Sequence, residues 1–285
     1  MSLRFPALLC ALCTVIACEV ISVEETPEET YPIIIPVLET GTLSELNQQY
    51  QVFNNGELCS TLNEFGFTGF SRVLFPGGVN PCLSREPVRV ELTNQDTLRT
   101  LAKEILVKNA LYTNVTDTVT LELLEELPIN GCTVCEGPGL NNVPIEWKFT
   151  FRGQEIEGFE VPETQITVFV DNEGVNRVWG NWYPEVVFPP VKQVGFAIAR
   201  QKMEGWQFFM EEFTGEEIVF TVSENELNEI PVESPLVLRD TDRLEIRNTW
   251  KVPIHYSHPT FSGWFAFVDV MDGTILKIEP KLIQP

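Results

Sequence analysis

The sequence predicts an α+β protein in which helices pack on antiparallel sheets, and three observations support this fold class. Apolar residues recur at helical spacing in two places, and strand-like segments follow each of them. Helix, strands and turns recur in the same order in the two halves of the chain. With 44% hydrophobic residues among 285, a sizeable core can be buried. We therefore expect two helix-on-sheet units after a loop-rich N-terminal segment.

The N-terminal residues are typical of an export signal. Arg4 precedes an apolar run at 5–17, which ends in Val15-Ile16-Ala17-Cys18. About thirteen residues span roughly 20 Å as a helix, less than the ~30 Å hydrocarbon core of a bilayer, so a signal peptide over 1–17 fits better than a membrane anchor. The end of the run resembles the lipobox of bacterial lipoproteins. That resemblance implies cleavage before Cys18 and a lipid on its thiol; an ordinary signal peptide with an incidental cysteine is the alternative.

The composition indicates an acidic protein that works outside the cytoplasm. The formal net charge is −22, which disfavours binding to nucleic acid or to anionic lipid headgroups. A solvated acidic surface is the simplest explanation, with calcium or a basic partner as alternatives. Residues 18–30 are acidic and contain proline, as expected of a flexible tether. We expect a lipid anchor to hold the chain to a bacterial membrane, facing the periplasm or the cell surface.

Four cysteines remain after the signal is removed, and an even set in an oxidising compartment predicts two disulfides. They are Cys59, Cys82, Cys132 and Cys135. Three pairings are possible, and we favour Cys59–Cys82 and Cys132–Cys135. The second pair also permits a thiol–disulfide exchange function, although the Glu136-Gly137-Pro138-Gly139 that follows cannot open a helix that would activate a thiol. A four-cysteine zinc site is a further alternative, but it normally contains two closely spaced pairs.

The segment over 31–92 is rich in Cys and Gly and is expected to contain little helix. A run at 31–38 is interrupted by prolines, which is typical of an edge strand. Residues 53–87 form a long loop in this interpretation, and the alternation of Val88, Val90 and Leu92 predicts a short strand.

The two units that follow are predicted over 93–188 and 189–285. In the first, Thr93 or Asn94 caps a helix with an apolar face made of Leu98, Leu101, Ala102, Ile105 and Leu106. In the second, Pro189-Pro190 introduces a helix whose apolar face holds Val191, Val194, Ala197 and Ile198. Strands are expected at 119–123, 145–152, 165–170, 217–222, 244–256, 263–270 and 274–279.

An internal repeat connects the two units. Trp147-Lys148 matches Trp250-Lys251, each in a strand. Later in each unit, an aromatic and an aliphatic residue lead to an aspartate that enters a turn, and a glycine leaves it. These turn residues are Asp171, Gly174, Asp269 and Gly273. The chemistry supports hairpins, because aspartate caps turn amides and glycine supplies a positive φ.

This repeat resembles the PepSY family and the related propeptide modules of thermolysin-like peptidases, in which a helix packs on an antiparallel sheet. The resemblance covers about 93–285, and both copies depart from the family by long insertions. The block from Gly131 to Pro138, with Gly180 to Pro184, also resembles lipoproteins of Bacteroidota. In PepSY proteins the module usually restrains a peptidase or binds another envelope protein, and it brings no catalytic residues.

The sequence offers little for catalysis. The two histidines, His255 and His258, lie where a turn is predicted, and no HExxH or Gly-x-Ser-x-Gly motif accompanies them. They could bind a metal ion if a carboxylate joined them. Asp171 and Asp272 could serve as an acid–base pair, but turn capping explains both. We therefore expect no enzyme activity and no cofactor.

The preferred hypothesis is a non-enzymatic envelope lipoprotein that binds or restrains another envelope protein, with a peptidase as the first candidate. One alternative is a carbohydrate- or peptide-binding lipoprotein, because exposed aromatic rings give large contact areas. Trp179, Trp182 and Tyr183 are the candidates, since a Gly-Asn pair and a proline near them indicate a turn where burial is harder. The other alternative is the thiol–disulfide protein.

Replacing Cys18 by serine tests the predicted address. The Cys18→Ser precursor has no thiol to accept a lipid, so it should leave the membrane fraction and lose incorporation of labelled fatty acid. Cys13→Ser is the matched control, because that cysteine lies within the predicted signal. Membrane association of Cys18→Ser equal to that of the parent chain would contradict the lipid anchor.

Overall fold

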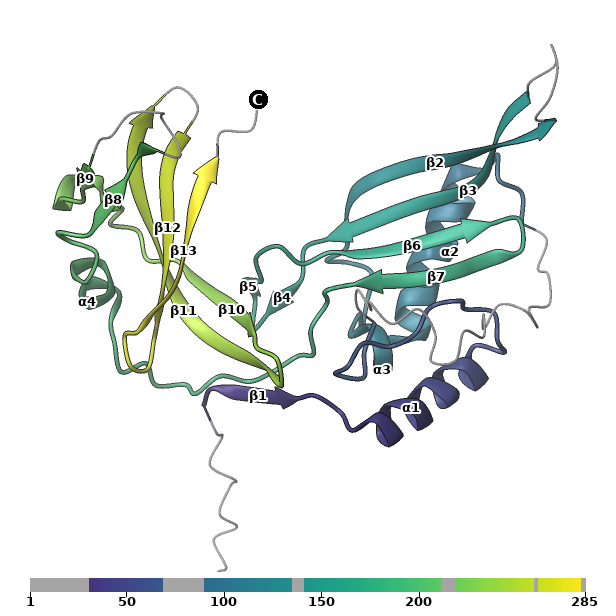
Figure 1. The fold of residues 1–285 in the computed structure, drawn as a ribbon, viewed down its shortest axis with the longest axis horizontal. Helices are drawn as coiled ribbons and strands as arrows, with labels where there is room; N and C mark the ends of the chain where they lie inside the picture. Colours follow the sequence, from purple (N-terminus) through teal and green to yellow (C-terminus); the bar gives the residue numbers. More distant parts are fainter. Residues whose placement is uncertain (1–30, 69–89, 135–140, 212–218, 259–260, 283–285) are drawn as a thin grey trace, which may run out of the picture. The chain divides into compact units, whose positions relative to one another are not determined.

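A computed structural model describes residues 31–68, 90–134, 141–211, 219–258 and 261–282 (Figure 1). By its internal contacts the chain divides into 1–30 and Tyr31–Pro285, and the following concerns the second part. The predicted signal peptide, tether and lipidated Cys18 lie outside the described residues, so those predictions stay untested by the structure.

Antiparallel sheet dominates the described chain, with few helices, so the fold is α+β or sheet-rich. The helices are α1 (Thr40–Phe53), α2 (Gln95–Lys108), α3 (Ala110–Thr113) and α4 (Phe196–Gln201), with a 3-10 turn η2 (Glu224–Glu226). The strands are β1 (Ile33–Pro36), β2 (Glu122–Val134), β3 (Asn141–Arg152), β4 (Glu155–Ile156), β5 (Phe159–Glu160), β6 (Ile166–Asp171), β7 (Gly174–Gly180), β8 (Gln207–Phe209), β9 (Val219–Thr221), β10 (Glu233–Arg239), β11 (Arg243–His258), β12 (Phe261–Asp269) and β13 (Ile275–Leu282). Among these residues, no helix has the length and apolar character that crossing a membrane requires.

Helix α2 forms and packs as its sequence predicts. The side chain of Asn94 accepts a hydrogen bond from the backbone N–H of Thr97, which satisfies one of the free amides at the helix start. Leu98, Ala102 and Leu106 recur on one face and are fully buried. This face contacts strands β3, β6 and β7 of a four-stranded sheet with the order β2-β3-β6-β7. Burial of the apolar stripe therefore holds the helix on the sheet.

The second sheet has five strands and is organised around β11. Its order is β1-β11-β12-β13, with β10 also paired to β11. Helix α4 contacts β11, but it covers only Phe196–Gln201. The prediction that a helix begins at Pro189-Pro190 was therefore wrong, because the chain stays non-helical up to Gly195. Ala199 is the fully buried helical position, whereas Ile198 is 52% exposed.

The N-terminal segment is more ordered and more buried than its composition predicts. Helix α1 was not expected, yet Tyr50 is fully buried in the core that also holds α2. Beyond α1, Leu58 and Leu62 enter this same core. The prediction of a strand at 88–92 was wrong for its described part, because 90–92 lies outside any strand. The run at 31–38 does contain an edge strand, β1.

Each sheet holds a buried tryptophan in a corresponding position. Trp147 pairs with Val170 across β3 and β6, and Trp250 pairs with Val268 across β11 and β12. The indole N–H of Trp147 donates to the carbonyl of Leu92 at 3.0 Å, just before α2. That of Trp250 donates to the carbonyl of Val194 at 2.7 Å, just before α4. Both tryptophans thus tie the start of a helix to a sheet.

The turns that follow β6 and β12 also have matching geometry. The Oδ1 of Asp171 accepts from the N–H of Glu173, and the Oδ1 of Asp269 accepts from the N–H of Met271, both at 2.7 Å. Gly174 and Gly273 have positive φ values of 107° and 70°. Aspartate capping and glycine at the hairpin turns, as expected from the sequence, are confirmed.

Gly263 is the glycine on which the second sheet depends most directly. It has a φ of +117°, and a Cβ at this position would lie 1.9 Å from the carbonyl oxygen of Ile254. Gly263→Ala should therefore lower the free energy of unfolding by more than about 2 kcal/mol, measured by urea titration. Gly41→Ala is the control, because nothing lies within 4 Å of its added Cβ in α1. An unchanged stability of Gly263→Ala would contradict the strand geometry described here.

Candidate functional site

Strand β2 is an open edge of the first sheet, as Figure 1 shows. Among the described residues it pairs only with β3. Leu123, Leu124 and Leu127 are 40%, 50% and 46% exposed along it. The opposite edge strand, β7, is partly covered, because the N–H of Cys59 donates to Asn176 and the N–H of Val178 donates to Ser60. An unpaired strand with exposed apolar side chains is a site where another strand can add.

The acidic side chains of β2 bind cations of their own sheet and helix. Glu126 accepts two hydrogen bonds from Arg99 of α2, at 2.6 and 3.0 Å. Glu125 pairs with Lys148, and Glu122 pairs with Arg152 of β3. These carboxylates are therefore neutralised within the protein, and the exposed leucines are the main apolar surface of this edge.

The face of the first sheet opposite α2 carries a row of two cations and one aromatic ring. Lys148, Phe169 and Arg177 are direct cross-strand neighbours on β3, β6 and β7. The guanidinium of Arg177 lies 4.2 Å from the centroid of Phe169 and also pairs with Glu146 at 2.6 Å. The second sheet repeats this row with Lys251, Phe267 and Lys277 on β11, β12 and β13.

The three aromatic residues predicted to bind a ligand do not form one exposed row. Trp182 is 4% exposed and belongs to the core around α2, which contradicts its expected place at the surface. Tyr183 is half-buried and packs between two smaller apolar clusters. Trp179 is 37% exposed, and its ring meets Phe169 edge-on at 5.1 Å. Trp179 is thus the most exposed of the three.

The histidines and the two aspartates lie in separate parts of the described sheets. His255 is exposed and His258 is half-buried at the end of β11, next to the connection to β12. Within the described residues, no three His, Cys, Asp or Glu side chains are grouped so that they could hold a metal ion. Asp171 and Asp272 each accept a hydrogen bond from a turn amide, at 2.7 Å, in different sheets. Turn capping therefore accounts for both.

The cysteine predictions cannot be followed through the structure. Cys82 and Cys135 lie outside the described residues, and the side chain of Cys132 at the end of β2 is not described either. Cys59 lies half-buried in the turn region after α1. Both pairings, and the thiol–disulfide alternative, stay predictions.

A buried polar cluster that sequence reasoning missed fixes the end of β12. Asp269 is fully buried and accepts hydrogen bonds from Arg247 at 2.9 Å and from the hydroxyl of Tyr31 at 2.8 Å. Burial and the bond to Asp269 raise the pKa of Tyr31 above its usual range. Glu245 accepts bonds from Arg247 and Arg243 at 3.1 and 2.9 Å, which lower the pKa of Glu245 against the effect of burial.

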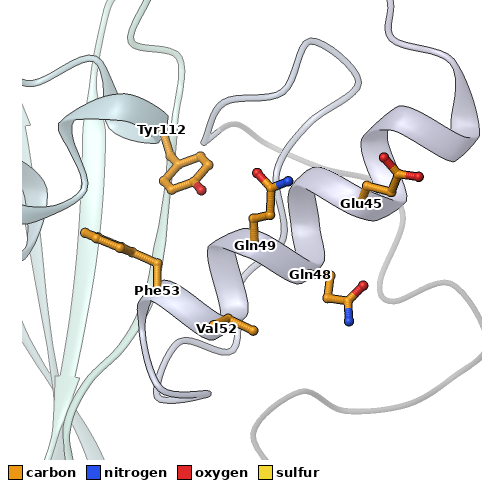
Figure 2. Close-up of a pocket in the computed structure, with 6 residues that line it drawn as sticks. All are labelled: Glu45, Gln48, Gln49, Val52, Phe53 and Tyr112. Carbon is orange, nitrogen blue, oxygen red and sulfur yellow. The ribbon is translucent and has the colours of Figure 1, made fainter.

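An open groove of about 610 Å³ lies beside α1, as Figure 2 shows. Its apolar side chains include Val52 and Phe53, which are 71% and 50% exposed. Tyr112 and three polar residues of α1 complete the lining, which consists of Glu45, Gln48, Gln49, Val52, Phe53 and Tyr112. A single carboxylate among amides and apolar groups offers contact area and no acid–base pair.

Comparison with known proteins adds little to this geometry. No protein-family model and no curated protein matches the sequence. Among solved structures, the Bacillus megaterium YpeB C-terminal domain is similar over 71% of each chain, with 10% sequence identity and a TM-score of 0.28. At this score the similarity supports no argument about function.

The cluster around Glu245 makes stability depend on pH. The pKa of Glu245 is lower in the folded protein than in the unfolded chain. The stability that its carboxylate adds is therefore present above about pH 4.5 and is lost as the pH falls through the folded-state pKa. Glu245→Gln should lower the free energy of unfolding by about 1 kcal/mol at pH 7, and the difference should shrink as the pH falls through the folded-state pKa of Glu245. Glu104→Gln, an exposed carboxylate on α2, is the control. A pH-independent difference would contradict the role of the carboxylate charge.

Proposed function

We propose that this chain is a non-enzymatic, lipid-anchored envelope protein that binds another envelope protein through the β2 edge. The observation that carries the proposal is a strand with a free side on which three leucines are exposed, Leu123 on the side of Phe151 and Leu127 on the side of Lys148. Main-chain hydrogen bonds from an added strand would supply affinity, and the leucines would select apolar side chains on the partner. An envelope peptidase is the first candidate partner.

We propose further that the two sheets are copies of one PepSY-like module. Three features support the duplication: the strand order after each helix, the pairing of each tryptophan with the valine before the turn aspartate, and the bond from each indole to the chain before a helix. The copies differ in the length of their helices, because α2 covers Gln95–Lys108 and α4 only Phe196–Gln201. The shorter helix leaves β8 and β9 to cover part of the second core, where Phe208 stacks on Trp264.

The carbohydrate- or peptide-binding alternative is weaker than the sequence indicated. It required a row of exposed rings, and Trp182 is buried, so the expected row is not present at these positions. The ring of Trp179 is also engaged by Phe169, and the guanidinium of Arg177 lies 5.9 Å from its centroid. The Trp179 ring that a sugar could stack on is therefore already in contact with Phe169 and near Arg177.

Photo-crosslinking in the native envelope tests the proposed site. A crosslinking residue at Leu127 should capture a defined protein, whereas one at Leu111, which is 79% exposed on α3, should not. In solution, Leu124→Lys/Leu127→Lys should weaken binding of the captured protein at least tenfold, because charged side chains on an edge oppose strand addition. Leu111→Lys/Val187→Lys is the matched control, with two exposed apolar residues elsewhere.

Two results would contradict the proposal. Equal capture at Leu127 and Leu111 would show that the β2 edge is not the contact. Hydrolysis of a peptide or glycan panel by the purified chain, lost on replacing His255 or His258, would show an enzyme.

A further inference from the structure

The face of the second sheet opposite α4 carries a cluster of lysines and phenylalanines, which we call the lysine face; Phe267 is fully buried there, whereas Lys251, Phe265, Lys277 and Lys281 are half-buried. Three adjacent strands contribute to it, with Lys251 on β11, Phe265 and Phe267 on β12, and Lys277 and Lys281 on β13. The register places Phe267 directly between Lys251 and Lys277. A gathering of cations is unexpected in a chain with a formal net charge of −22.

The equivalent row on the first sheet shows what is distinctive here. There, both cations are neutralised by carboxylates of the same sheet: Lys148 by Glu125 and Arg177 by Glu146. Among the lysines of the lysine face, only Lys277 is neutralised by carboxylates. It pairs with Glu279 at 2.6 Å and with Glu163 at 3.3 Å.

Lys251 and Lys281 have no carboxylate partner among the described residues, and both rest on one aromatic ring. Their ammonium nitrogens lie 4.3 and 5.3 Å from the centroid of Phe265. The ring attracts both charges through its quadrupole, which holds the two lysines beside it. Each ammonium carries three N–H donors, and the donors that point away from the ring are available for carboxylate oxygens.

From this arrangement we propose that the lysine face binds an acidic peptide segment of a partner protein, with carboxylates on Lys251 and Lys281 and apolar contact on Phe265. One acid, Glu279, lies on this face directly opposite Phe265, but its carboxylate is paired with Lys277 at 2.6 Å. The acids elsewhere on the chain do not prevent binding. At physiological ionic strength the Debye length is about 8 Å, so a short peptide responds to the cations it touches and little to distant carboxylates. An anionic membrane would instead meet the acidic surface over a wide area, which disfavours it as the ligand.

This surface is separate from the β2 edge, and its test does not depend on the partner sought there. The probe is a fluorescein-labelled peptide of alternating glutamate and leucine, with a glutamine-for-glutamate peptide as its neutral counterpart. Fluorescence anisotropy with the mature chain at about 0.15 M salt measures binding under the screening assumed above. We expect the acidic peptide to bind and the neutral peptide to bind at least fivefold more weakly.

Variants assign the binding to the two lysines. Lys251→Gln/Lys281→Gln should weaken acidic-peptide binding at least fivefold. Lys103→Gln/Lys108→Gln is the matched control, because each of those lysines also lies over a phenylalanine, at 5.7 and 5.8 Å, but the two occupy different rings. Lys251→Arg/Lys281→Arg keeps both charges and should retain binding, which separates loss of charge from loss of fold.

Three outcomes would overturn the proposal. The first is equal loss of binding in the two glutamine variants, and the second is equal affinity for the acidic and neutral peptides. The third is binding to phosphatidylglycerol vesicles without binding to the acidic peptide.

Discussion

The contact between a buried indole N–H and the carbonyl that precedes a helix orders both sheets. Burying an indole without an acceptor costs about 1–3 kcal/mol, so the chain before each helix must reach the tryptophan. The chain before each helix also bonds to a hairpin turn. In the first sheet the N–H of Val90 donates to the carbonyl of Asn172, and in the second the N–H of Val194 donates to that of Val270, both at 2.9 Å. Tryptophan, turn and helix start therefore constrain one another, and the helix can cross the sheet in few ways.

On the opposite faces of the sheets, charge compensation decides which surface is available. Both sheets place two cations beside a phenylalanine, yet the first sheet satisfies its cations with its own carboxylates. On the second sheet, Lys277 pairs with Glu279 of the same sheet and with Glu163 between β5 and β6, whereas neither carboxylate pairs with Lys251 or Lys281. A similar row of cations and aromatic rings thus gives one surface whose cations are neutralised within the protein and one with two cations that are not. Surface ion pairs contribute little stability, so such differences arise at small energetic cost.

The sequence predicted those parts of the fold that depend on local rules. The cap at Asn94, the apolar stripe of α2 and the aspartate–glycine turns all follow from residue chemistry within a few positions. Helix α1 was missed because its sequence from Thr40 to Phe53 is mostly polar, and only contact with the core buries Tyr50. The second helix was placed too early because Pro189-Pro190 is followed by irregular, bent chain that becomes helical only after Gly195. The β2 edge carried no local signal, since an edge is defined by the absence of a neighbouring strand.

The amino-acid sequence alone determined the class of fold, the acidic surface and the positions of the two tryptophan strands, because alternation, charge and turn chemistry act over short distances. Tertiary structure decided which side chains are accessible. Trp182 and Trp179 are three residues apart in similar local sequence, but one enters the core and the other stays at the surface. Tertiary structure also decided that Asp269 bonds to Tyr31 and Arg247, and that Lys251 and Lys281 lie beside the ring of Phe265. These contacts join residues far apart in the chain, and only the packing of distant strands brings them within reach.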